Sequence, residues 1–116
     1  MNEIAERLGA TVLTHQDKAS RVNVQRVYAG DRISALLSEG TETTLLVTNL
    51  SNALLPRVAQ LVDAAAICLV SGGSPDPVVI KAADEHGIVL MVSPADMFET
   101  CGLLYRCLNR MRSAGQ

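Results

Sequence analysis

The sequence predicts an α/β fold: a single-domain three-layer sandwich with a central, mostly parallel sheet and a short α/β extension at its N-terminus. Three observations support this prediction. Three apolar segments recur at 22-residue intervals, and helical stretches separate them. These segments are continuously apolar, which is typical of parallel strands covered on both faces. The length of 116 residues fits one domain, and a hydrophobic content of 48% excludes a disordered chain.

The first thirty residues predict the start of the extension. Residues 3–8 favour an amphipathic helix that Gly9 ends, and a strand is expected over 11–14. Residues 22–24 alternate like a half-buried strand, and the phase slips at residues 26–27, as at a bulge. The extension therefore contributes further strands to the sheet.

A short helix is expected next, between a turn at Gly30 and an end at Gly40. Its inward face is predicted to consist of three aliphatic residues: Ile33, Leu36 and Leu37. Asp31 has two interpretations at this point. It is a helix N-cap, a position that aspartate favours, or an acid available to a ligand.

The repeat itself predicts a βαβαβα unit over residues 44–112. Its strands are expected over residues 44–48, 65–70 and 88–92. A strict 22-residue register would give Val47, Leu69 and Met91 equivalent positions in the three strands. It would also align the polar residues that follow the strands, which are Asn49, Ser71 and Ser93.

Helices fill the intervals between these strands. One apolar stripe consists of Leu54, Leu55, Val58, Leu61 and Val62, and a second of Val78, Val79, Ala82 and Ala83. Gly87 is expected to end the second helix. Ser74 and Ser93 each precede a proline, so we expect them to cap the helices that follow, with Asp96 in the first turn of the last helix.

The last helix, expected from Pro94 to about Met111, is unusually apolar. Its stripe has coiled-coil spacing, and Tyr105 adds apolar surface beside it. The helix is a broad core helix or a self-association surface. A mean hydropathy of +0.22 with only three aromatic residues favours apolar surface hidden against a second copy. The expected homodimer interface consists of Met97, Cys101, Leu104, Tyr105, Leu108 and Met111.

A ligand is expected at the carboxyl edge of the sheet, where open α/β folds bind small molecules. A Gly-Gly pair before a helix suits a small anionic or nucleotide-like ligand, although the same residues also make an ordinary strand-to-helix turn. The candidate ligand-binding residues are Asp31, Asn49, Ser51, Asn52, Ser71, Gly72, Gly73, Ser74, Ser93 and Asp96.

Other classes of function have no support in the sequence. Ten basic residues against twelve acidic ones leave a net charge of −2, which does not favour nucleic-acid binding. No apolar run approaches the roughly 20 residues of a membrane span, and the N-terminus lacks a signal-peptide pattern. The histidines and cysteines lack metal-binding spacing, so we expect no metal and no cofactor.

The three cysteines are expected to be reduced thiols of a cytoplasmic protein. Cys68 lies in a predicted strand and Cys101 in the apolar stripe, so both are expected to be buried. Cys107 is expected to be the most accessible of the three. None has an identifiable activating partner, and we expect no catalytic residues and no enzyme.

Several segments, in order, resemble the DRTGG domain over essentially the whole chain. They are residues 28–31, 46–49, 65–67, 71–76 and 93–105, of which the last, with Phe98, Glu99, Gly102 and Tyr105, is the most specific. The chain departs from the signature that names the family. The segment at residues 20–27 keeps Arg21 as the candidate for the motif's arginine and lacks the glycine pair.

The resemblance implies a regulatory α/β module that pairs through a dimer interface and has no established catalytic residues. Such domains accompany CBS domains in inorganic pyrophosphatases, precede phosphate acetyltransferase domains, or stand alone. We therefore expect a non-catalytic, cytoplasmic homodimer that senses a small ligand or binds a partner protein such as an enzyme. Two alternatives remain: an enzyme or accessory subunit acting on a phosphorylated metabolite at the carboxyl edge, and a purely structural dimerisation module.

Overall fold

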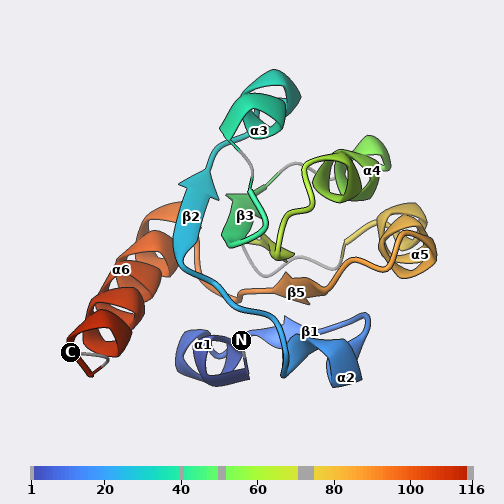
Figure 1. Ribbon diagram of the computed structural model, residues 1–116. Helices are drawn as coiled ribbons and strands as arrows, with labels where there is room; N and C mark the ends of the chain where they lie inside the picture. The colour runs from blue at the N-terminus through green and yellow to red at the C-terminus, as the bar shows by residue number, and fades with distance from the viewer. Residues whose placement is uncertain (1, 40, 50–51, 71–74, 115–116) are drawn as a thin grey trace.

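A five-stranded mixed sheet forms the centre of the molecule in the computed structural model, which describes residues 2–39, 41–49, 52–70 and 75–114 (Figure 1). The strand order is β1-β5-β4-β3-β2. Strands β2 to β5 are parallel, and β1 pairs with β5 in the antiparallel sense. The strands are β1 (Thr11–Val12), β2 (Arg26–Ala29), β3 (Thr44–Thr48), β4 (Ala66–Leu69) and β5 (Leu90–Val92).

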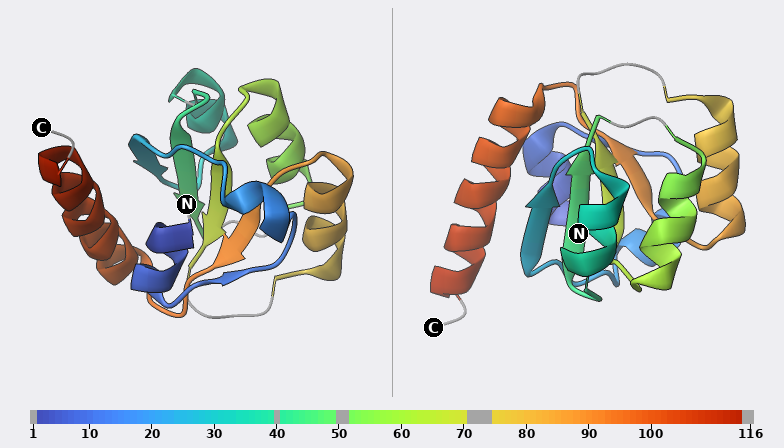
Figure 2. Two further views of the ribbon diagram at one scale, coloured as in Figure 1. Left: turned by 60° about the horizontal axis from the view of Figure 1, so that its bottom comes forward. Right: turned by 90° about the horizontal axis from the view of Figure 1, so that it is seen from above.

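Helices cover both faces of this sheet, as the predicted three-layer architecture requires. They are α1 (Asn2–Leu8), α2 (Gln16–Ala19), α3 (Ile33–Glu39), α4 (Leu54–Leu61), α5 (Pro77–Glu85) and α6 (Met97–Ala114). Helices α1 and α6 pack together on one face, and α3, α4 and α5 lie on the other (Figure 2). Right-handed crossovers that progress along a sheet in one direction place their helices on one face, which accounts for the second layer.

Alternate residues of each strand supply the two halves of the core. Leu45, Val47 and Cys68 face α1 and α6, while Leu46 and Ile67 face α4 and α5. All five of these side chains are fully buried. Since both faces are covered, β4 and β5 are apolar throughout, and β3 is apolar between its two terminal threonines.

The repeat is less regular in space than in sequence. Leu45 pairs with Ala66, 21 positions further along the chain, whereas Ile67 pairs with Leu90, 23 positions further. The strict 22-residue register is therefore wrong by one position at the middle strand. Val47 and Met91 face α1 and α6, but Leu69 faces the opposite layer. A shift of one residue reverses the face to which a side chain points.

The N-terminal prediction is correct for α1 and β1 and wrong for residues 22–24, which form no strand. The strand of this region is β2, and it starts at Arg26. The amides of both Gln25 and Arg26 donate to the Thr43 carbonyl, at 2.9 and 3.1 Å. The phase slip in the sequence therefore coincides with the start of a strand.

The glycine stops predicted after α1 and α5 are confirmed, and Gly40, the stop expected after α3, lies outside the described residues. The starts of α5 and α6 lie later than expected. Gly87 follows α5 with a φ of 69°, and the Ile88 amide donates to the Ala83 carbonyl at 2.9 Å, as in a Schellman motif. Helix α5 is capped by Asp76, whose carboxylate accepts a hydrogen bond from the Val78 amide at 2.9 Å. The expected cap, Ser74, lies outside the described residues.

Four apolar residues that were expected to face inward lie partly or largely in solvent: Leu37, Leu54, Leu61 and Val78. Their neighbours Leu55, Val58 and Val79 are buried as predicted. A single face of the sheet covers a limited arc of each helix, so the outer residues of a broad stripe stay exposed. The side chains of Ile33 and Leu36 lie outside the described set.

Candidate functional site

The carboxyl edge of the sheet brings together several of the residues predicted to bind a ligand. Asp31 follows β2, Asn49 follows β3 and Ser93 follows β5. Because these strands are parallel, the three residues lie at the same edge. The side chains of Asp31 and Asn49 are exposed there. Five further candidates, Ser51, Ser71, Gly72, Gly73 and Ser74, lie outside the described residues.

The remaining candidates at this edge bond to nearby main-chain or hydroxyl groups. The Asn52 side chain accepts a hydrogen bond from the Leu54 amide at 2.8 Å, and the Asp96 carboxylate accepts one from the Glu99 amide at 2.9 Å. Asp96 thus caps α6, three residues later than the cap expected at Ser93. The Ser93 hydroxyl is fully buried and lies 2.9 Å from the Thr100 hydroxyl. These oxygens stabilise the start of the α4 and α6 segments.

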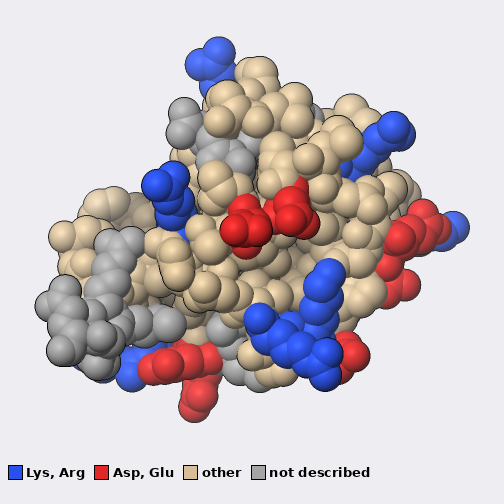
Figure 3. Space-filling view, in the orientation of Figure 1, with Lys and Arg blue, Asp and Glu red and all other residues tan. Residues whose placement is uncertain are grey.

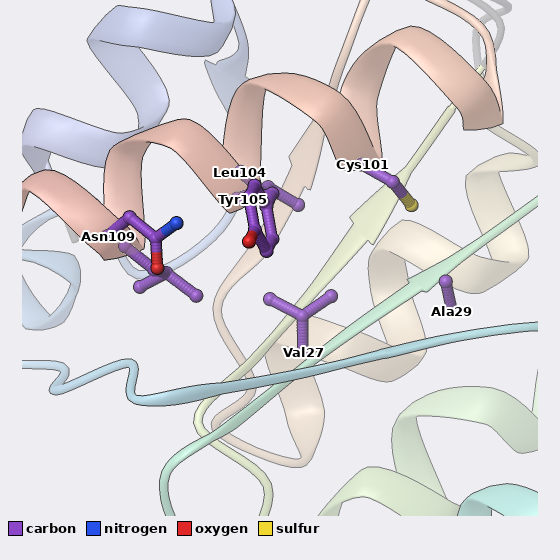
Figure 4. Close-up of a pocket in the computed structure, with 7 residues that line it drawn as sticks. Val27, Ala29, Cys101, Leu104, Tyr105 and Asn109 are labelled. Carbon is purple, nitrogen blue, oxygen red and sulfur yellow. The ribbon is translucent and has the colours of Figure 1, made fainter.

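A second candidate site is an apolar groove of about 340 Å³ between α6 and β2. Figure 4 shows Tyr105 and Cys101 on the helix side and Val27 and Ala29 on the strand side. The groove is lined by Val27, Ala29, Cys101, Leu104, Tyr105, Leu108 and Asn109. Its volume is within the range of ligand and peptide pockets, about 300–1,000 Å³. Asn109 supplies the amide of this otherwise apolar lining.

The strand side of the groove is an edge of the sheet. The Arg26 amide donates to the carbonyl of Thr43, just before β3, at 3.1 Å, and the amide of Gly30, just after β2, donates to the Val47 carbonyl of β3 at 2.9 Å. Backbone groups alternate in direction along a strand, so the N–H and C=O groups of Val27 and Ala29 point away from β3. Among the described residues, no strand pairs with this outer side of β2. The groove therefore lies next to unpaired backbone donors and acceptors.

The helix side of the groove carries exposed aromatic residues. Phe98 and Tyr105 are 90% and 71% exposed, and they lie seven residues apart, on the same face of α6. Only one further aromatic residue, Tyr28, occurs in the chain. Large aromatic side chains are characteristic of interfaces and uncommon at such exposure.

The residues predicted for a dimer interface divide into two groups in the structure. Leu104 and Leu108 are buried against the sheet, and Met97 and Cys101 are partly buried there. Tyr105 points outward, and the side chain of Met111 lies outside the described set. The coiled-coil stripe therefore packs within the molecule, and its flank borders the groove.

The prediction is correct for Cys68 and wrong for the other two cysteines, whose exposures are reversed. Cys68 is buried as expected, but Cys107 is also buried, and Cys101 is the partly exposed thiol. Cys107 faces α1, which packs against α6. Burial raises the pKa of Cys68 to about 12 and raises the pKa of both other thiols. Burial disfavours the thiolate in each case, so nucleophilic reactivity is low.

Charged groups do not assemble into a metal site within the described part of the chain: no cluster of three or more His, Cys, Asp or Glu side chains occurs there. On the face seen in Figure 3, basic and acidic residues form small scattered spots, some acidic ones near the middle of the face, on a largely uncharged surface. No helix among the described residues is long and apolar enough to cross a membrane.

Some residues of the groove were not singled out from the sequence: Val27, Ala29 and Asn109. Identifying them requires knowing that β2 lies at a sheet edge beneath α6, which depends on the strand order. Asn109 could have been predicted to lie near Tyr105, because it follows Tyr105 by four residues and so lies on the same helix face.

Comparisons with known proteins complete the description. A family model described as the DRTGG domain matches residues 3–107. The structure of the CBS and DRTGG domains from the regulatory region of Clostridium perfringens pyrophosphatase, complexed with the activator diadenosine tetraphosphate, is similar with a TM-score of 0.67. The identity is 15%, and the match covers 89% of this chain and 44% of that chain, so our chain spans less than half its length.

No curated protein is similar enough in sequence to count as a match. The family model nevertheless covers most of the chain, including the Tyr28–Asp31 and Phe98–Tyr105 segments on which the resemblance rested. The parallel sheet with helices on both faces agrees with the fold of the pyrophosphatase regulatory region. On these grounds, the chain belongs to the DRTGG domain family.

Proposed function

We propose that this chain is a non-catalytic regulatory module that acts as a homodimer in the cytoplasm, where it senses a small ligand or binds a partner enzyme. The two copies associate through one surface, which consists of the exposed face of α6 and the outer side of β2. The observation that carries the proposal is the groove at this surface, bordered by Tyr105 on the helix and by Val27 and Ala29 on the strand.

The exposed aromatics support a partner of protein character. Phe98 and Tyr105 lose their exposure only if another surface covers them. Burial of apolar surface contributes about 25 cal/mol per Å², and aromatic side chains offer the largest areas. A second copy of the chain supplies an identical pair, and two-fold symmetry is the commonest arrangement of such assemblies.

The strand edge supports pairing of the same kind. The outward N–H and C=O groups of Val27 and Ala29 are able to form a ladder with an equivalent strand. Two copies of β2, related by a two-fold axis, would run antiparallel. The ladder would join the two sheets, and the groove beside it would accept side chains from the partner.

The oligomeric state tests this proposal directly. We expect sedimentation equilibrium to show a dimer for the native chain and a shift towards monomer for Tyr105→Asp, because a carboxylate is costly in an apolar interface. Leu61→Asp is the matched control. Leu61 is equally exposed, at 69%, but lies on α4, on the opposite face of the sheet. A native chain that stays monomeric at tens of micromolar contradicts the dimer.

The ligand is tested separately from the dimer. The similar pyrophosphatase region is complexed with a dinucleoside polyphosphate, so an anionic nucleotide-like compound is the class that we propose. We expect diadenosine tetraphosphate or ATP to raise the melting temperature in a saturable manner. The absence of a shift with any nucleotide would contradict nucleotide sensing and leave the dimer to be judged by sedimentation.

The enzymatic alternative places a phosphorylated metabolite at the carboxyl edge, beside Asp31 and Asn49. Both side chains are exposed there, which is the observation in its favour. Turnover of acyl phosphates or phosphate esters that is lost in Asp31→Asn would support this alternative. Activity that survives this substitution would contradict a role for Asp31 as the base.

A further inference from the structure

We propose that Arg7, Arg106 and Arg110 form an anion-binding site between α1 and α6 that takes the phosphate group of a small phosphorylated compound. This site is separate from the groove at β2 and from the carboxyl edge of the sheet. It does not depend on the proposed dimer.

The three arginines surround one cavity. The cavity has a volume of about 160 Å³ and is lined by Arg7, Leu103, Arg106, Cys107 and Arg110. Arg106 and Arg110 are four residues apart, so they project from the same face of α6. Arg7 comes from the last turn of α1, which packs against that face. Helices α1 and α6, which are distant in sequence, therefore bring three arginine side chains to one cavity.

The size of the cavity limits what it can accept. A water molecule occupies about 30 Å³ in the liquid, so the cavity has room for about five water-sized atoms. A phosphate group has one phosphorus and four oxygens, which suits this space. The volume lies below the range of about 300–1,000 Å³ for whole drug-sized ligands. A cavity of this size that is open to solvent suits a phosphate group, and the remainder of a larger compound would lie in solvent.

The charges of the site are only partly balanced. Arg7 Nε lies 3.3 Å from Glu3 Oε1, and within the described residues this is the ion pair of the cluster. Arg106 and Arg110 have no acidic partner in that part of the chain. The protein as a whole carries a net charge of −2, so a concentration of three cations is a local feature.

Cys107 lies within reach of several of these charges. Burial raises the pKa of its thiol, Arg7 and Arg110 lower it, and Glu3 raises it again. All three charged groups therefore lie close enough to act on one sulfur atom. The same convergence would act on an oxyanion at the mouth of the cavity.

Arginine chemistry favours phosphate at such a site. Each guanidinium presents N–H donors in a planar fork that matches two oxygens of a phosphate. The oxygens of one phosphate are able to engage forks from different directions.

Pyrophosphate binding at constant ionic strength tests the proposal. We expect the native chain to bind pyrophosphate saturably in equilibrium dialysis and to gain thermal stability with it. Arg106→Ala and Arg110→Ala should each weaken binding about tenfold, the loss expected for one charge-assisted contact. Glu3→Gln should tighten binding, because it frees Arg7. This gain is not expected if the arginines only stabilise the helix ends.

Arg57→Ala is the matched control. Arg57 is an exposed helical arginine on α4, on the far face of the sheet, and its loss should leave pyrophosphate binding unchanged. Binding that falls equally in Arg57→Ala and Arg106→Ala would overturn the proposal, as would a native chain with no saturable binding at millimolar pyrophosphate. Tyr105→Asp should bind pyrophosphate normally, which separates this test from that of the dimer.

Discussion

Ser93 and Thr100 join the end of β5 to the first turn of α6 through a hydroxyl–hydroxyl hydrogen bond of 2.9 Å. Both side chains are fully buried. The Ser93 hydroxyl also accepts a bond from the Ala95 amide at 3.3 Å, and the Thr100 hydroxyl donates to the Ala95 carbonyl at 3.4 Å. This network fixes the point from which α6 leaves the sheet, and therefore the position of the helix beside β2.

Thr100→Val tests this network. The substitution keeps the shape of the side chain and removes the hydroxyl, so Ser93 loses a partner in a buried site. We expect a loss of about 1–3 kcal/mol in the free energy of unfolding, measured by urea denaturation. The double variant with Ser93→Ala should lose less than the sum of the two single losses. Additive losses would mean that the two hydroxyls do not stabilise each other.

Thr14→Val tests the junction between β1 and β5. The buried Thr14 hydroxyl donates to the Ile88 carbonyl at 2.6 Å and accepts from the Leu90 amide at 2.9 Å, so one side chain bonds to the first residue of β5 and to the segment just before it. Valine leaves both groups without this partner. We expect a loss of about 1–3 kcal/mol by urea denaturation, with faster hydrogen exchange at Leu90. Exchange at Leu90 unchanged from the native chain would argue against this role.

Asp63→Gly should stabilise the protein. Asp63 follows α4 with a φ of 57°, a left-handed conformation that disfavours residues with a Cβ. Gly9 and Gly87 occupy equivalent positions after α1 and α5. We expect a gain of about 0.5–1 kcal/mol, or roughly 2–4 °C in melting temperature. Gly87→Ala is the reciprocal variant and should lower the melting temperature; a gain there would contradict the argument.

Alkaline pH should destabilise the fold through Cys68. Burial raises the pKa of this thiol from 9.0 to about 12, so the folded state disfavours the thiolate that the unfolded state forms. Its contribution to stability is complete below the unfolded pKa and is lost as pH rises from 9.0 towards about 12. Urea denaturation across this range should show the loss. Cys68→Ala should have a smaller pH dependence than the native chain, and an equal dependence would exclude Cys68 as its source.

Thiol labelling should distinguish the three cysteines. Cys101 is partly exposed in the groove, whereas Cys68 and Cys107 are buried. We expect iodoacetamide to modify Cys101 first, slowly at neutral pH because its pKa is raised. Under the proposed dimer, labelling should slow further as protein concentration rises. Mass spectrometry would identify the modified residue, and early labelling of Cys107 would contradict the structure.

The sequence was informative about the fold because the strands are covered on both faces. The segment at residues 44–48, apolar between two threonines, forms β3 at the predicted residues. Its 22-residue repeat, however, is the mean of pairing offsets of 21 and 23. Such one-residue differences arise in loops and strand ends, where they leave no trace in hydropathy. The spacing of apolar residues therefore could not predict the exact pairing register of the strands.

The starts of the helices were predicted three residues too early at α6, for a physical reason. Serine before proline and aspartate are both good caps, and residues 93–96 offer both. The structure uses Asp96, since Ser93 is buried beneath the helix with Thr100. Which of two suitable caps is used depends on tertiary packing.

The functional surfaces were the least predictable part. A stripe of coiled-coil spacing on α6 predicted an interface, and Leu104 and Leu108 of that stripe proved to be buried within the molecule. The groove beside them depends on β2, and the arginine cluster depends on the contact of α1 with α6. Both sites join segments that are remote in sequence, so periodicity along one segment does not reveal them.

The two borders of the sheet are unequal: β1 has two residues, Thr11 and Val12, while β2 has four. So short a border offers little template for another chain, and growth of the assembly is confined to the β2 side. When two molecules pair through β2, each uses the one sheet edge that is long enough to pair, and neither has a second such edge. Association of this kind closes on itself and cannot continue into fibres.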